Sequence, residues 1–280
     1  MDKEALEAAA LGAIHRKLIS GSHILHHHHV LDAYGHLSVR HPWKPDVFIL
    51  SRDAAPATIS SPRDLVEYWV KDASPVDPEH APKGFAERHI HSELYRAYPS
   101  IQSVVHSHAD AVLPYTINGV PLRPCYHMAG FLGHWSPVWD IASARPGGGG
   151  GNGNGNGNGN GDMLVRTEAL GAALAQQFKY ATTVVLMRGH GFTAVAGEGG
   201  GIEEAVFRAV YTALNAAVQT TALTTQAAYH SRNDAPLQPI KFLSPEEAEA
   251  SKAMARDTVM RPWGLWLREV EASNLYLNSA

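Results

Sequence analysis

The chain has 280 residues, of which 45% are hydrophobic and 18% are charged. This content is enough to bury a full-sized core, and it excludes a wholly disordered chain. The formal charge is -4 and no stripe of lysine and arginine occurs, so nucleic acid and anionic membrane surfaces are not expected partners.

The N-terminal segment, MDKEALEAAALGAIHRKLI, is acidic and has helical periodicity, unlike the basic start of a secretory leader. No apolar run approaches the roughly 20 residues that a membrane-spanning helix needs. We therefore expect a soluble cytoplasmic protein.

The first half of the chain alternates helical and strand patterns. Helical periodicity covers residues 3–32, and the short strands HLSVR and DVFILS then flank the turn HPWKP. The segment AERHIHSELYRAYP predicts a helix over 86–99, which Pro99 ends, and QSVVHSH predicts the strand 102–108 that follows.

The second half continues the alternation. TTVVLMRG predicts a strand over 182–189, and GGIEEAVFRAVYTALNAAVQTTAL predicts a long helix over 200–223. A capping box from Ser244 to Glu247 begins a helical C-terminal extension. Helices interleaved with strands indicate a layered α/β fold.

Residues 147–161, GGGGGNGNGNGNGNG, form a low-complexity segment with no side chains for a core. Such a segment is typical of a flexible linker between two domains. We interpret it instead as an insertion within one domain of residues 1–280, because the chemistry described next needs residues from both sides of it.

Two histidines on a predicted strand form the first candidate site. Residues i and i+2 of a strand point to the same face, so His106 and His108 present their rings side by side. The preceding helix places Glu87, His91 and Tyr95 at i, i+4 and i+8 along one face. A carboxylate is thereby expected near the imidazole pair.

A third histidine, His190, lies between two glycines at the end of the second apolar strand. Cys125 is the only cysteine, so a metal site in this chain must use histidines and carboxylates. Three histidines with an open position are typical of a catalytic zinc-type site, where Glu87 would be the acid/base or an exchangeable ligand.

Other histidines are weaker candidates. His26 to His29 are consecutive, and on a helix they point in directions about 100° apart, so they cannot converge on one ion. Asp110 suits either a partner for one ligand ring or a helix cap.

The segments AERHIHSELYRAYPSIQSVVHSHAD and MRGHG resemble the class II aldolase/adducin family over roughly residues 5–225. The resemblance implies a three-layer αβα sandwich with a central, largely antiparallel sheet, and a homotetramer with active sites at subunit interfaces. It also implies that His106, His108 and His190 are ligands of a divalent metal ion, with Glu87 as the catalytic acid/base. Zinc is the first expectation, and manganese, iron and cobalt are alternatives.

Departures from the family pattern concern the substrate. The positions at which sugar-phosphate aldolases of this family hold phosphate read YGHLS, SRDAAP and GFAE, with His36, Arg52, Phe85 and Ala86 in place of small polar residues. A phosphorylated sugar is therefore disfavoured. The stretch HMAGFLG is similar to a subgroup that includes decarboxylases of dihydroxylated aromatic acids such as dihydroxyphthalate.

The same resemblance places His127, beside Tyr126, where the aldolases have a proton-donating tyrosine. We expect Arg52 and Arg123 to hold a carboxylate of the substrate. Aromatic side chains are expected to wall a pocket for its ring: Tyr126, Phe131, Trp135 and Trp139.

These observations predict a metal-dependent carbon–carbon lyase that decarboxylates a hydroxylated aromatic carboxylic acid, without an organic cofactor. An aldolase acting on a non-phosphorylated hydroxy-keto acid is the first alternative. A non-heme iron oxygenase on the same fold and a non-catalytic adducin-like interaction module are the others.

Overall fold

The structure is a computed structural model that describes residues 3–144, 161–179, 182–197, 199–231 and 238–280. The predicted Gly/Asn insertion at 147–161 falls outside these ranges, except for Gly161.

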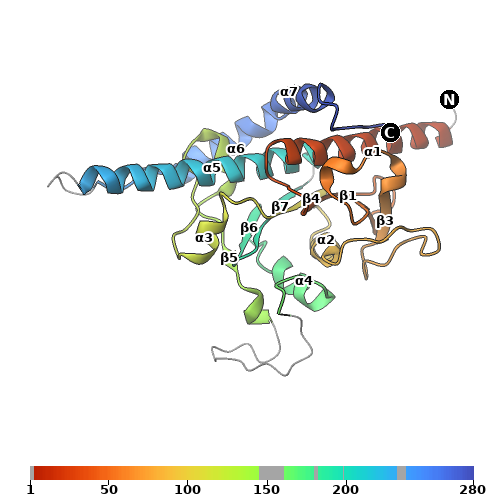
Figure 1. The fold of residues 1–280 in the computed structure, drawn as a ribbon, viewed down its shortest axis with the longest axis horizontal. Helices are drawn as coiled ribbons and strands as arrows, with labels where there is room; N and C mark the ends of the chain where they lie inside the picture. The colour runs from red at the N-terminus through yellow and green to blue at the C-terminus, as the bar shows by residue number, and fades with distance from the viewer. Residues whose placement is uncertain (1–2, 145–160, 180–181, 198, 232–237) are drawn as a thin grey trace.

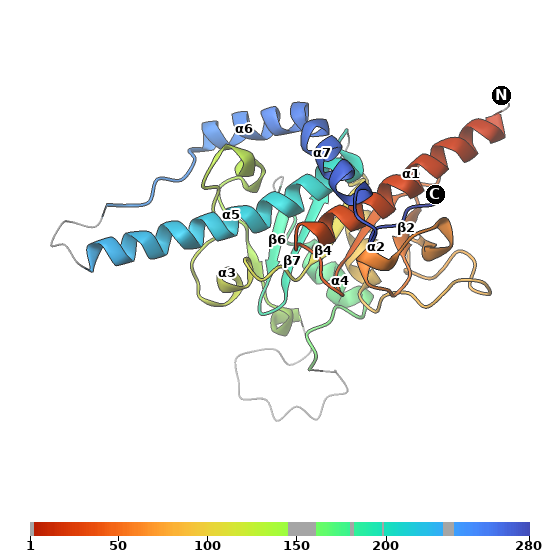
Figure 2. The ribbon, with the colours of Figure 1, turned by 45° about the horizontal axis from the view of Figure 1, so that its top comes forward.

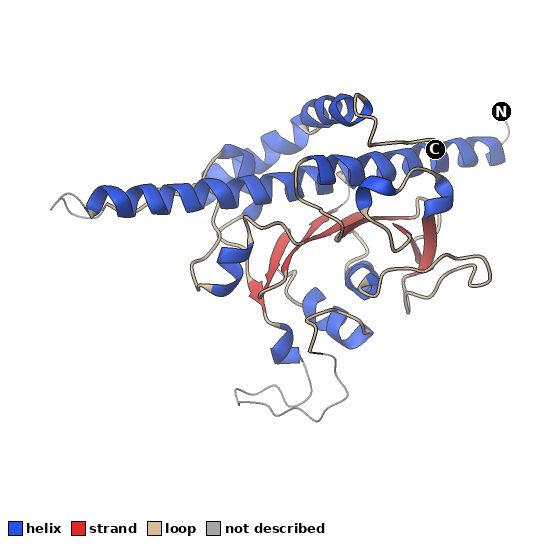
Figure 3. Ribbon diagram, in the orientation of Figure 1, coloured by secondary structure: helices blue, strands red, loops and turns tan. Residues whose placement is uncertain are grey.

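A seven-stranded sheet forms the centre of the molecule, in the order β3-β2-β1-β4-β7-β6-β5 (Figure 3). All neighbouring strands are antiparallel except β5 and β6, which are parallel. Chain segments from both sides of the gap at 145–160 thus join one sheet. The strands are β1 (His36–Arg40), β2 (Val47–Ser51), β3 (Leu65–Trp69), β4 (Ser103–Ser107), β5 (Val138–Trp139), β6 (Val184–Met187) and β7 (Gly191–Ala196).

Helices cover both faces of this sheet (Figure 1). On one face lie α1 (Lys3–His27) and α5 (Gly201–His230), and on the other α2 (Arg88–Ala97) and α4 (Glu168–Ala175). Side chains alternate between the faces: Val105 joins the α1/α5 core, whereas its neighbour Val104 joins the α2/α4 core. The predicted three-layer αβα sandwich with a largely antiparallel sheet is confirmed.

The C-terminal extension packs on the outside of the α1/α5 layer (Figure 2). It consists of α6 (Pro245–Thr258) and α7 (Met260–Glu271). The predicted capping box is present: Ser244 Oγ accepts the Glu247 N–H, and the Glu247 carboxylate accepts the Ser244 N–H. Trp263 and Trp266 of α7 enter the α1/α5 core.

The remaining elements are short: α3 (Leu113–Ile117) and the 3₁₀ helices η1 (Pro56–Thr58), η2 (Pro62–Asp64), η3 (His127–Leu132) and η4 (Ile141–Ala144). No helix within the described ranges is long and apolar enough to cross a membrane.

Some predicted boundaries were wrong. The first helix ends at His27 rather than at residue 32, because His29 takes a left-handed φ of 57° and the Leu25 carbonyl accepts the N–H groups of Val30 and Leu31. The helix predicted over 86–99 begins at Arg88. The helix predicted over 200–223 continues to His230.

Candidate metal centre

His106 lies near the end of β4 and faces the α2/α4 layer, as Val104 does two residues earlier. The sheet register pairs it with His36 on β1 and with Thr193 on β7. Its side chain is fully buried, and this burial lowers the pKa of the imidazole well below 6.5. His106 is therefore a neutral ring with a nitrogen free to bind a metal ion.

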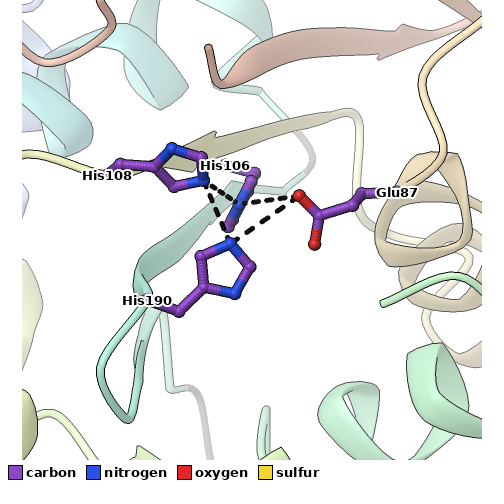
Figure 4. A group of neighbouring side chains, drawn as sticks. All are labelled: Glu87, His106, His108 and His190. Atoms are coloured by element: carbon purple, nitrogen blue, oxygen red, sulfur yellow. Dashed lines mark hydrogen bonds and ion pairs between the residues drawn. The ribbon is translucent and has the colours of Figure 1, made fainter. Parts of the chain in front are cut away.

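His108 follows the end of β4 by one residue, and its ring turns back toward His106 (Figure 4). The two Nε2 atoms lie 3.0 Å apart. The prediction that His106 and His108 lie side by side is confirmed, while Val105 and Ser107 face the α1 side, where Ser107 Oγ donates to the Val30 carbonyl.

His190 sits in the tight turn between β6 and β7, where Met187 pairs with Gly191. Gly189 has a φ of 62° and allows this turn. A Cβ on Gly191 would lie 2.0 Å from the Ser107 carbonyl oxygen, so only glycine lets β7 approach β4 so closely. This approach brings His190 Nε2 to 3.0 Å from His108 Nε2.

Glu87 completes the group from the opposite side (Figure 4). One oxygen, Oε2, lies 3.6 Å from His106 Nε2 and 3.7 Å from His190 Nε2. The other, Oε1, accepts the Val165 N–H at 3.0 Å. Burial raises the pKa of the carboxyl group, and the nearby His190 opposes this shift.

The backbone at Glu87 differs from the prediction. Glu87 is the residue before the first turn of α2 and does not share a helix face with His91 and Tyr95. The side chains of those two residues reach Ser38 on β1 instead of the metal centre. The expected closeness of the carboxylate to the imidazole pair is nevertheless confirmed.

These four side chains fit a divalent cation. Their ligand atoms all lie within 4.8 Å of one another, and they are the one such group of histidine, cysteine and acidic residues in the described ranges. Three imidazole nitrogens and a carboxylate oxygen suit zinc, manganese, iron or cobalt. If the three imidazoles alone bind the ion, the fourth position of a tetrahedral site stays open, as in catalytic metal sites.

Sequence reasoning missed the groups that hold the four ligands in place. The residues just after the gap at 145–160 supply two of them, since Val165 bonds Glu87 and the Met163 backbone bonds His190. Thr193 Oγ1 lies 3.4 Å from His106 Nδ1. Such partners fix ring orientation and tautomer. The sheet register, which the sequence does not reveal, brings Thr193 beside His106, and the tertiary fold brings Met163 and Val165 to the site from the segment before α4.

Asp32, rather than Asp110, is the carboxylate whose charge acts on His108, where it opposes the fall in pKa caused by burial. A cavity of about 230 Å³ borders His108 here, and its lining includes His26, His29, Asp32 and Asp110. This cavity gives the candidate metal centre a polar edge beside His108.

The run His26 to His29 does not converge, as predicted. The side chains of His27 and His28 point toward Glu269, at 3.9 and 3.8 Å, whereas His26 Nδ1 bonds the Tyr276 hydroxyl.

Within the described residues, no hydrogen bond, ion pair or ring contact joins the other predicted site residues to the four ligands. Arg52 pairs with Asp64 at 2.7 Å. Arg123 stacks on Phe242, and Tyr126 packs between His127 and Tyr211. His127 is exposed at the start of η3, on the α5/α6 side of the sheet.

The expected aromatic pocket is not formed within one chain. Phe131 is buried in the α1/α5 core and Trp139 in the α2/α4 core, on opposite faces of the sheet. Trp135 is 53% exposed. Phe131 and Trp139 are core residues, and packing rather than substrate binding explains their presence.

Comparisons with known proteins agree with this geometry. Residues 16–220 match the family profile described as "Class II Aldolase and Adducin N-terminal domain". The chain is 52% identical to decarboxylase tropJ of Talaromyces stipitatus, over 95% of this chain and 97% of that protein. It is 32% identical to 3,4-dihydroxyphthalate decarboxylase of Arthrobacter keyseri, over 43% of this chain and 41% of that protein.

The fold is also that of a solved structure, L-fuculose 1-phosphate aldolase from Glaciozyma antarctica PI12. The TM-score is 0.63 at 17% identity, and the match covers 97% of this chain and 94% of the other. The resemblance predicted from the histidine and glutamate spacing is confirmed.

Proposed function

The chain belongs to the class II aldolase and adducin family, and we propose that it is a metal-dependent carbon–carbon lyase that decarboxylates a hydroxylated aromatic carboxylic acid. One observation carries the proposal: three histidines and Glu87 converge in a chain that is 52% identical to a named decarboxylase over nearly its whole length. We propose zinc as the first choice of metal, held by His106, His108 and His190.

Decarboxylation breaks the bond between the ring carbon and the carboxylate carbon. The electron pair stays on the ring carbon, carbon dioxide leaves, and a proton must then be added to that carbon. When bound, the divalent cation supplies Lewis-acid stabilisation of the negative charge that develops on oxygens beside the breaking bond.

Glu87 is our first choice for the group that handles the proton. Its Oε2 is beside two of the three ligand rings, whereas its Oε1 is fixed by the Val165 N–H. A carboxyl group held in one orientation and buried in this way can keep a proton close to the reacting carbon. Its proton would replace the carboxylate on the ring.

His127 is the second proposed proton donor. It is exposed and lies on the face of the sheet opposite the four ligands, so we propose that it acts on the centre of a neighbouring subunit in a homotetramer. Arg123 and Tyr126 share its segment and would reach the substrate in the same way, whereas Arg52 would orient the carboxylate from the residue just after β2.

Two observations support an aromatic acid as the substrate. The partial relative from Arthrobacter keyseri is named for a dihydroxylated aromatic acid. Two of the positions that differ from the sugar-phosphate pattern lie beside the candidate metal centre, because the ring of His36 contacts both Phe85, at 4.5 Å between centroids, and His106, at 5.2 Å. An aromatic ring and an imidazole suit a planar acid better than a phosphate.

The test is release of carbon dioxide by the metal-loaded enzyme from a panel of dihydroxybenzoates, trihydroxybenzoates and dihydroxyphthalates. We expect at least one of them to yield carbon dioxide and the corresponding phenol in equal amounts. Release of pyruvate or an aldehyde from hydroxy-keto acids, with no carbon dioxide from the panel, would favour the aldolase instead. Oxygen consumption would indicate an iron oxygenase.

A further inference from the structure

A buried chain of hydrogen bonds runs from the edge of the metal centre into the α2/α4 core. His36 Nδ1 lies 2.6 Å from His91 Nε2, and His91 Nδ1 lies 2.6 Å from Ser38 Oγ. Ser38 Oγ in turn lies 2.7 Å from the Tyr95 hydroxyl. None of these four side chains is a metal ligand, and all are at least 97% buried.

His36, the first residue of this hydrogen-bond chain, contacts the candidate metal centre. His36 is the register partner of His106 on the neighbouring strand, and their rings are in contact. The Nδ1 atom of His36 is hydrogen-bonded to His91, which lies on α2. Because the two nitrogens of an imidazole point to different sides of the ring, Nε2 points away from His91. No residue of the described ranges accepts from or donates to this Nε2 atom at hydrogen-bond distance.

The donors of this hydrogen-bond chain can all point in one of two directions, from Tyr95 toward His36 or from His36 toward Tyr95. The contact between the two imidazoles needs one protonated and one unprotonated nitrogen, so the state of His91 sets the state of His36. Ser38 then has to donate to His91 Nδ1 or accept from it. Each direction gives His36 a different tautomer.

Tyr95 decides between the two directions. Its buried hydroxyl has one hydrogen-bond partner, Ser38 Oγ, among the described residues. If Tyr95 donates to Ser38, each of the three contacts has one donor and one acceptor, and the proton left over is on His36 Nε2, which is not among the fully buried, unpartnered polar atoms of the described residues. In the reverse direction the Tyr95 proton would be buried without an acceptor, which is costly. Tyr95 therefore donates to Ser38, Ser38 to His91 Nδ1, and His91 Nε2–H to His36 Nδ1.

We infer that this chain fixes His36 as the neutral tautomer with its proton on Nε2, and so makes it a hydrogen-bond donor to the substrate. Such a donor suits an anionic oxygen, either the carboxylate or a phenolate of the acid. His91, Ser38 and Tyr95 are positioning residues. The inference rests on the proposed function only for the identity of the ligand.

Joint neutron and X-ray crystallography of the metal-loaded enzyme in heavy water tests the tautomer directly. We expect deuterium on Nε2 of His36 and none on its Nδ1. The reverse placement would overturn the inference. In a Tyr95→Phe variant the preferred direction is lost, and we expect deuterium on both nitrogens of His36 at partial occupancy. Full occupancy at Nε2 in that variant would remove Tyr95 from the explanation.

Calorimetric binding of 3,4-dihydroxybenzoate to the zinc-loaded enzyme tests the donor. We expect His36→Phe to weaken binding by about 10- to 100-fold, because a hydrogen bond to a charged group is lost. His36→Gln keeps an N–H donor and should restore most of the binding affinity that His36→Phe loses. His41→Gln, at a buried histidine that follows the same strand, is the matched control. Unchanged binding by His36→Phe would overturn the inference.

The two proposals fail in different ways. If the wild type does not bind this probe, the aromatic substrate is in doubt, and the neutron structure still decides the tautomer of His36. If the wild type binds the probe and deuterium is on Nδ1, the proposed function stands and the donor role of His36 is lost.

Discussion

His108 and His190 are 82 residues apart in the chain, and their Nε2 atoms lie 3.0 Å apart. This contact, made where β4 ends and β7 begins, joins the two parts of the candidate metal centre. We expect His106→Ala and His190→Ala each to lose the single equivalent of bound metal, measured by elemental mass spectrometry after dialysis. Neutral imidazoles facing one another supply the affinity, and two of them hold the ion too weakly.

The run His26 to His29 would bind metal adventitiously in this experiment and has to be replaced in every sample. His80→Ala is the matched control, since His80 pairs with Asp77 in an exposed loop. Retention of one equivalent in His190→Ala would separate His190 from the site.

Glu87→Gln separates metal binding from proton transfer. The amide keeps the shape of the side chain but cannot carry the proton, so we expect decarboxylation to slow by about 100-fold or more. The three histidines remain, and the metal content should stay near that of the wild type. Glu67→Gln, on β3, is the control. If Glu87→Gln keeps full activity on the best substrate of the panel, the proton comes from another group.

His127 tests whether sites are shared between subunits. His127→Ala is expected to bind metal normally and to lose activity, because its own centre is intact but the second proposed proton donor is missing. Mixing it with inactive His106→Ala chains, after dissociation and reassembly, should restore part of the activity through sites that combine the two subunits. The readout is the rate of carbon dioxide release in the mixture against each variant alone. No recovery in mixed oligomers would mean that His127 does not act on the centre of a neighbouring subunit.

Much of this centre could be predicted because its signal is local. The i, i+2 spacing of His106 and His108 is a local signal at the end of a strand, and the glycines beside His190 mark the turn at Gly189 and the close approach to β4 at Gly191. The position of His36 opposite His106 could not be predicted, since register is a property of the pairing of two strands. Phe131 and Trp139 were misassigned because an aromatic residue has the same pattern in a core and in a pocket.

The buried imidazole of His91 gives stability a defined pH dependence. Burial lowers its pKa from 6.5 to about 3 in the folded protein. Between these values the unfolded chain binds more protons, so the free energy of unfolding falls as the pH is lowered. Between pH 7 and pH 5, His91 alone should lower the free energy of unfolding by about 2 kcal/mol.

The measurement is urea unfolding of metal-free protein at both pH values, with His91→Gln as the comparison. Glutamine has no group that titrates, so the variant should lose about 2 kcal/mol less than the wild type over this range. The histidines that do not contact His91 cancel in the difference. Equal losses in the two proteins would mean that His91 is not neutral and buried in the folded state.

The two glycines beside His190 should respond differently to the same substitution. A Cβ at Gly189 meets open space. Alanine there should lower the free energy of unfolding by about 1 kcal/mol, because of its left-handed φ of 62° alone. A Cβ at Gly191 would lie 2.0 Å from the Ser107 carbonyl oxygen and 3.0 Å from His108 Cα. Because both are backbone atoms, β4 and β7 must separate, and we expect a loss of about 3 kcal/mol or more.

The same separation would pull His190 away from His108, so Gly191→Ala should also lose its bound metal while Gly189→Ala keeps it. Urea unfolding and metal analysis of the two variants check both expectations. A stable Gly191→Ala protein with a full equivalent of metal would show that the close approach of β7 to β4 does not position His190. Equal effects of the two substitutions would point instead to the turn as the element that matters.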